Sequence, residues 1–151
     1  MKWTRRRIVV AASLAVIVAV PTWWLGSPLF IVVHGNEAPP EGYENVVAQG
    51  MFVDGEPGHH NSGRAILLSK GMSFVLRLEN FSVTNGPDIH VFLAKGPRVG
   101  AADVDLGGVK VTEGSANYRV PASVDPRAFQ YVVIWCVPFS VQFGYAELTF
   151  Q

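Results

Sequence analysis

The stretch FQYVVIWC, residues Phe129–Cys136, decides the fold, because it is apolar on both of its alternating faces. A strand without a polar face is covered on both sides, which predicts the central strand of a sheet. Side chains alternate along a strand, so we expect Trp135 and Cys136 to point in opposite directions. Pro138 then forces a turn directly after the strand.

From Val46 onward, short apolar runs are separated by Gly, Pro, Asn and Asp every 8 to 15 residues, and no apolar residues recur at helical spacing for three turns. This pattern predicts an all-β, antiparallel sandwich or barrel-like domain. In the clearest run, Phe74–Glu79, alternation directs Phe74, Leu76 and Leu78 to the core and directs Arg77 and Glu79 to water. The other predicted strands are 46–53, 65–69, 89–94, 105–111, 117–121, 129–136 and 140–150.

Two local features refine this picture. The apolar residues of 140–150 change phase at Gly144, which predicts a β-bulge there. Asn85-Gly86-Pro87 is a turn signal in which Gly86 permits a positive φ and Pro87 fixes the next φ, so that Asp88 caps the turn.

The N-terminal part of the chain predicts a membrane anchor. Residues 8–25 carry no charge and follow a basic flank, residues 1–7; that length just spans a bilayer. The positive charges of the flank are expected to keep residues 1–7 in the cytoplasm. Membrane lipid then surrounds 8–25, and Trp23 and Trp24 lie at the outer interface. The rest of the chain is expected to be extracytoplasmic, as in a bacterial cell envelope. A cleaved signal peptide is the alternative, and it exports the same residues.

Residues 26–45 contain three prolines, three glycines and three glutamates, which indicates a linker to a β domain at 46–151. The whole chain has 12 basic and 12 acidic residues, but four of the basic ones lie in the first seven positions. The remaining eight basic residues against 12 acidic ones leave a mildly acidic domain with no basic patch, so nucleic acid is excluded as a partner.

Cys136 is the only cysteine, and it lies in a part of the chain that we expect to be exported, where thiols usually pair. It cannot form an intramolecular disulfide. One interpretation is a small core residue; the other is a reactive thiol or a metal ligand at the end of its strand.

His59 and His60 lie in a polar loop and are the candidate partners of Cys136 for a metal or haem. Solvent-exposed loop histidines are the simpler interpretation. Trp135 joins Cys136 and His60 as a candidate cofactor contact, His90 is expected to face solvent, and His34 has no assigned role.

Several site classes are disfavoured. A blue-copper site needs two His and a weak axial ligand, but no His or Met follows Cys136. Structural zinc lacks a second cysteine or a correctly spaced His pair. No Gly-x-Ser-x-Gly occurs, so a hydrolase is not expected.

Several motifs together resemble the DM-thirteen domain over about Val46 to Phe150. Those that carry the resemblance are Gly50-Met51-Phe52, His60-Asn61-Ser62-Gly63, Leu78-Glu79-Asn80-Phe81, Asn85-Gly86-Pro87-Asp88 with Ile89-His90-Val91-Phe92-Leu93, Leu106-Gly107, Tyr118-Arg119-Val120-Pro121, Ile134-Trp135-Cys136, Phe139-Ser140-Val141 and Phe143-Gly144-Tyr145-Ala146.

The resemblance implies a β-sandwich-like module of a family that is often found beside cytochrome-like DOMON domains. It further implies electron transfer or redox chemistry through the family's single cysteine, here Cys136. The other redox centre would be a partner protein or a bound cofactor, with haem or another metal as open alternatives.

Two function classes therefore stand. In the first, the domain is a membrane-anchored redox module in which Cys136 cycles through sulfenic acid or a mixed disulfide, or binds iron. In the second, it is a non-enzymatic binding or structural module in which Cys136 is a core residue.

Overall fold

The computed structural model describes residues 4–26 and 32–151, and the chain divides into two compact units, residues 1–31 and 32–151. In the first unit, helix α1 (Arg5–Gly26) contains the predicted apolar segment. Its residues Arg5–Trp23 are long and apolar enough to cross a membrane. Of the predicted linker, residues 27–31 lie outside the described part, as do the side chains of Trp24 and Leu25.

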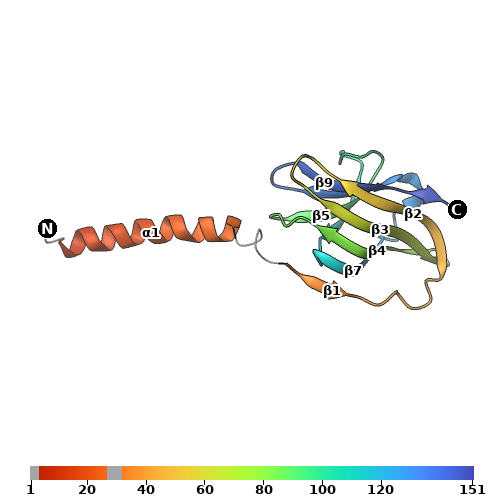
Figure 1. The fold of residues 1–151 in the computed structure, drawn as a ribbon, viewed down its shortest axis with the longest axis horizontal. Helices are drawn as coiled ribbons and strands as arrows, with labels where there is room; N and C mark the ends of the chain where they lie inside the picture. Colours follow the sequence, from red (N-terminus) through yellow and green to blue (C-terminus); the bar gives the residue numbers. More distant parts are fainter. Residues whose placement is uncertain (1–3, 27–31) are drawn as a thin grey trace. The chain divides into compact units, whose positions relative to one another are not determined.

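The second unit is one curled sheet, a half-barrel, which confirms the predicted all-β, barrel-like class (Figure 1). Along the sheet the strands run β1-β7-β4-β3-β2-β9-β8-β5-β6, and β10 pairs with β2. Only β1 pairs in parallel, with β7, among the described strands. Their bounds are β1 His34–Asn36, β2 Asn45–Asp54, β3 Asn61–Lys70, β4 Ser73–Val83, β5 Ile89–Ala94, β6 Val104–Gly108, β7 Glu113–Arg119, β8 Tyr131–Cys136, β9 Val141–Glu147 and β10 Thr149–Phe150.

The curl comes from β2, which pairs with β3 through Asn45–Met51 and with β9 through Phe52–Asp54. The two halves of the sheet therefore face each other across one core. That core is fully buried and includes Leu67, Leu76, Leu78, Val91, Leu93, Val132, Ile134 and Phe81.

The central position of FQYVVIWC is confirmed. β8 lies between β9 and β5, and Val132, Val133 and Ile134 are completely buried. The predicted bulge is also confirmed: Ile134 is paired with Gly144 and Trp135 with Gln142, so Phe143 is the extra residue in β9. Phe143 and Ala146 are three residues apart, so in a regular strand their side chains would point to opposite faces. The extra residue of the bulge directs both of them into the core.

The segment predicted as a linker differs from that expectation after residue 31. Within it, β1 pairs with β7, and residues 32–45 belong to the compact unit. Gly35 and Gly114 allow this pairing, because Gly114 has φ +127° and a Cβ there would clash with the Gly35 carbonyl oxygen. The glycines that indicated a linker instead serve the close approach of two strands.

The prediction that Arg77 faces water is wrong. Its side chain is only 7% exposed, and Nη1 donates to the Glu37 carbonyl and to Asn117 Oδ1, both at 3.0 Å. The segment that follows β1 covers this face of β4, which leaves Val75 and Arg77 buried alongside Leu76. Side chains alternate along β4 as predicted, but the segment that follows β1 covers the face on which Arg77 lies.

The predicted turn before the strand at Ile89 is confirmed, because Pro87 and Asp88 form a turn directly before β5. The positive φ lies elsewhere than expected: Gly86 is not among the residues with positive φ, whereas Asp88 adopts φ +51°. A glycine is required at 86 because a Cβ there would overlap the Phe143 ring.

Candidate functional site

Cys136 is the last residue of β8 and its side chain faces the main core. It is 1% exposed, and its thiol donates a hydrogen bond to the Pro87 carbonyl oxygen at 3.0 Å. The opposite direction predicted for Trp135 fits the burial pattern, in which Trp135 is only half-buried. In register, Trp135 lies between His90 on β5 and Gln142 on β9.

Two thin segments cover the sulfur. One is the loop 85–88, whose Asp88 carbonyl accepts a hydrogen bond from the Val137 N–H at 3.1 Å. The other is the turn 137–140, in which all four residues are exposed. Asp88 and Ser140 both adopt left-handed φ values, +51° and +53°. The loop 85–88 and the turn 137–140 therefore meet beside the buried thiol at the end of β8.

Burial raises the pKa of the Cys136 thiol, the Phe139 N–H acts in the opposite direction, and the negative charge of Asp88 raises it further. The protonated thiol is the form that the closed site holds, because a buried thiolate lacks solvation. Nucleophilic chemistry at this sulfur requires the cover to open.

His90 holds one end of that cover. Its Nε2 lies 3.0 Å from Asp88 Oδ1 and its Nδ1 lies 2.7 Å from Asp105 Oδ2. Since carboxylates only accept, both ring nitrogens donate, which is the imidazolium form. Partial burial disfavours this charge, but the hydrogen bonds and charges of Asp105 and Asp88 outweigh it and raise the pKa of His90.

The expectation that His90 faces solvent is therefore corrected: its side chain, on β5, is 23% exposed and contacts Asp88 in the loop 85–88 and Asp105 on β6. The closeness of Asp88 and His90 in the sequence was the signal for this pair. Asp105, on β6, was not identifiable without the sheet order.

The structure places His59 and His60 in different surroundings. His60 is 81% exposed, with Nδ1 3.1 Å from Asp54 Oδ2. The His59 ring stacks on Phe143 with centroids 4.0 Å apart, and its Nδ1 is buried without a partner among the described residues. Phe143 in turn lies against Gly86, so the Phe143 ring lies between His59 and the loop 85–88 that Cys136 contacts.

The side-chain amide of Asn61, beside His59, is also buried without a partner in the described part of the chain. A Cβ at Gly144 would overlap this amide, which places Asn61 against the bulge of β9. Sequence reasoning did not single out Asn61, because a polar residue at a loop end normally faces water.

Within residues 4–26 and 32–151, no group of three or more His, Cys, Asp and Glu side chains is arranged to hold a metal ion. Cys136, His59 and His60 thus do not form one ligand set. Haem or iron on Cys136 does not fit this arrangement either, because the sulfur is buried and already donates to Pro87.

Comparison with known proteins adds one result. Residues 51–148 match the family model described as Electron transfer DM13. The match covers β3 to β9 together with the end of β2 from Met51, and it includes Cys136, the loop 85–88 and His90. Searches of curated proteins and of solved structures gave no match.

Proposed function

Because the chain belongs to the DM13 electron-transfer family, we propose that it is a membrane-tethered electron-transfer module outside the cytoplasm, with Cys136 as its redox-active thiol. The observation that carries this proposal is the family match over the region that holds the only cysteine. The position of the sulfur at the end of β8 supports it: the loop 85–88 and the turn 137–140 meet there, and their displacement would expose Cys136.

The proposed reaction is thiol–disulfide exchange with a partner protein. When the cover opens, the Cys136 thiolate attacks one sulfur of the partner's disulfide. A new S–S bond forms, the partner's S–S bond breaks, and its second sulfur leaves as a thiolate that takes up the proton lost by Cys136. A thiol of a second protein, a dithiol donor, then attacks the Cys136 sulfur, which releases the first partner as a dithiol. The donor's other thiol attacks the donor sulfur of the new mixed disulfide, so the donor is left with its own disulfide and Cys136 is released as a thiol. Two electrons pass from the donor to the first partner, and Cys136 is oxidised in the first half and reduced in the second.

The proposed tether is supported by α1 and its flank. The helix is long enough to cross a bilayer, and Arg5–Arg7 lie at its N-terminal end. Positive charges remain on the cytoplasmic side, which directs the β domain outward. That compartment is one in which disulfides persist.

The test uses the full chain in detergent micelles, equilibrated with buffers of reduced and oxidised glutathione. Mass spectrometry would follow the mixed disulfide, and circular dichroism would confirm that the β domain stays folded. We expect a mixed disulfide that forms and reverses in the folded protein. A mixed disulfide that accumulates only after the β structure is lost would contradict the proposal.

The burial of Cys136 favours a second candidate function, in which the domain is a binding or structural module and Cys136 is a core residue. Cys136 is almost completely buried and its pKa is raised, as for a core cysteine. In that case Cys136→Ala would keep the folded structure and every partner interaction. Loss of partner exchange in Cys136→Ala without loss of folding would exclude this alternative.

A further inference from the structure

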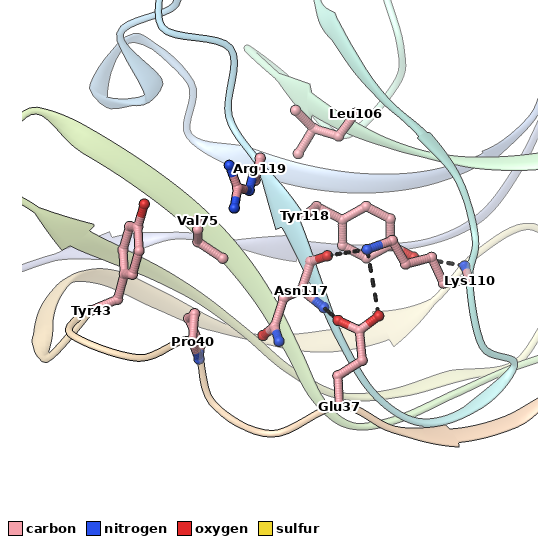
Figure 2. A pocket seen from close by; sticks show the side chains of 9 residues that line it. All are labelled: Glu37, Pro40, Tyr43, Val75, Leu106, Lys110, Asn117, Tyr118 and Arg119. Carbon is pink, nitrogen blue, oxygen red and sulfur yellow. Dashed lines mark hydrogen bonds and ion pairs between the residues drawn. The ribbon is translucent and has the colours of Figure 1, made fainter.

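A second site lies away from Cys136, at the part of the β7 edge that β1 leaves unpaired. The chain between β1 and β2 forms one wall of an open cavity of about 470 Å³ there. Figure 2 shows the side chains that line it. Arg77 and Asn117 fix this segment by bonding the carbonyls of Glu37 and Ala38, at 3.0 and 2.8 Å. Side chains from β4, β6 and β7 form the other walls. The cavity size suits a small organic molecule.

The cavity already contains one bound carboxylate, that of Glu37. Its Oε2 accepts the Asn117 backbone N–H at 2.8 Å, and its Oε1 lies 3.5 Å from Lys110 Nζ. The β7 edge, which β1 no longer covers beyond Ser115, therefore binds a carboxylate through one backbone N–H and one cation. This internal contact shows which ligand chemistry the edge accepts.

Arg119 repeats that arrangement two residues further along β7. Along a strand, successive backbone N–H groups point to opposite edges. The Val120 N–H donates to the Phe74 carbonyl on β4, so the Arg119 N–H points away from β4. It therefore points to the same edge as the Asn117 N–H. In the described part of the chain the Arg119 guanidinium has no hydrogen-bond or ion-pair partner, and neither does the Tyr43 hydroxyl. Both side chains line the cavity (Figure 2).

The remaining polar groups are already engaged. Lys110 Nζ donates to the Asn117 carbonyl at 2.5 Å and lies 5.0 Å from the Tyr118 ring centroid. Burial raises the pKa of Tyr118 to about 12, and the negative charge of Glu37 acts in the same direction. The hydrogen bond that the Tyr118 oxygen accepts from the Lys110 backbone N–H acts in the opposite direction. The Tyr118 hydroxyl therefore stays neutral. Arg119 is thus left as the cation for a ligand.

We propose that this cavity binds a small organic acid, whose carboxylate is held by the Arg119 guanidinium and N–H and by the Tyr43 hydroxyl. Its apolar body would lie against the Tyr43 ring, Val75 and Leu106. Phosphate would bind more weakly, because it has no apolar part and the nearby Glu37 carboxylate repels a second charge. This site is separate from Cys136, which is not among the residues that line the cavity.

The test is isothermal titration of the full chain in detergent micelles with sodium benzoate, and with the neutral isostere benzamide and inorganic phosphate as comparisons. We expect benzoate to bind at least tenfold more tightly than either, and Arg119→Gln to weaken benzoate about tenfold or more. Arg98→Gln is the matched control, because it removes an exposed arginine that pairs with Glu56 outside the cavity.

Equal binding of benzoate and benzamide would overturn the carboxylate assignment. Benzoate binding that is unchanged in Arg119→Gln, or lost equally in Arg98→Gln, would overturn the site. Tyr43→Phe separates the hydrogen bond of the Tyr43 hydroxyl from the packing of its ring. This variant should weaken the binding of benzoate modestly, because the hydroxyl is lost while the ring contact remains. Failure to detect any benzoate binding at millimolar concentration would refute the proposal.

Discussion

At the residue scale, Cys136 combines a buried sulfur with a shallow position at the end of its strand. Its raised pKa means that the folded domain disfavours the thiolate. The reactive form therefore exists only while the loop 85–88 or the turn 137–140 is displaced. This places the reactivity of the thiol under the control of its cover.

The pH dependence of alkylation tests this view of the thiol. In the folded protein, the midpoint of the rate of reaction with iodoacetamide should lie at higher pH than in denaturant, because burial raises the pKa of Cys136. Stopped-time mass spectrometry of the full chain would measure both profiles. Coincident midpoints would mean that the sulfur is solvated in the native state.

The His90 bridge predicts a pH-dependent stability. Its folded-state pKa is raised above the ordinary 6.5, so the stabilisation is fully present below about pH 6.5 and is lost as the pH rises through the folded-state value. His90→Gln should cost roughly 0.5–1 kcal/mol at low pH and less at high pH. Urea unfolding across this range would measure it.

The control for His90 is His60→Gln, which removes a similar Asp–His contact from a side chain that is 81% exposed. That variant should leave the pH profile of unfolding almost unchanged. If His90→Gln and His60→Gln changed the profile equally, His90 would have no special part in holding the cover.

At the element scale, β1 completes the domain, and Gly114 is the position that admits it. Gly114→Ala should destabilise the domain by about 3 kcal/mol or more, because it adds a clash with the Gly35 carbonyl to the cost of a positive φ. Gly58→Ala is the matched control: it has φ +90° but open space around its Cβ, so it should cost only about 1–2 kcal/mol. Equal costs in urea unfolding would show that β1 does not approach β7 this closely.

Elements with a strong periodic signal were predictable from the sequence. β5 has the predicted bounds, Ile89–Ala94, and β8 is central because its residues leave no polar face for solvent. β1 has only three residues, two of them polar and one glycine, so it carries no hydrophobic pattern and depends on pairing alone. β7 begins at Glu113, four residues earlier than predicted, for the same reason.

The site was predictable only in part. Cys136 was identifiable because it is unique, but the loop 85–88, one of the two segments that cover it, lies some 50 positions earlier and meets it through the β5–β8 pairing. Asp105 joins His90 through the pairing of β5 with β6. The burial of Arg77 likewise depends on the segment after β1. Contacts between distant strands require a strand order that one sequence does not contain.

At the scale of the whole molecule, the account requires that the β domain lies outside the cytoplasm. An alkaline phosphatase fused after Gln151 should be active, because it needs disulfides that form only after export. Replacing Arg5, Arg6 and Arg7 with Glu should lower that activity by weakening the positive-inside signal. The same fusion lacking residues 1–25 is the inactive control; equal activity of the two fusions would contradict the tether.

The electron-transfer proposal requires that Cys136 becomes accessible without unfolding of the domain. The most direct measurement compares two rates in one sample of the full chain: reaction of Cys136 with a disulfide reagent in native buffer, and global unfolding followed by tryptophan fluorescence. We predict that the thiol reacts much faster than the domain unfolds. Asp88→Asn, which loosens the cover, should accelerate the reaction severalfold more than Asp54→Asn does. A reaction rate equal to the unfolding rate in all three proteins would contradict the account and leave Cys136 as a core residue.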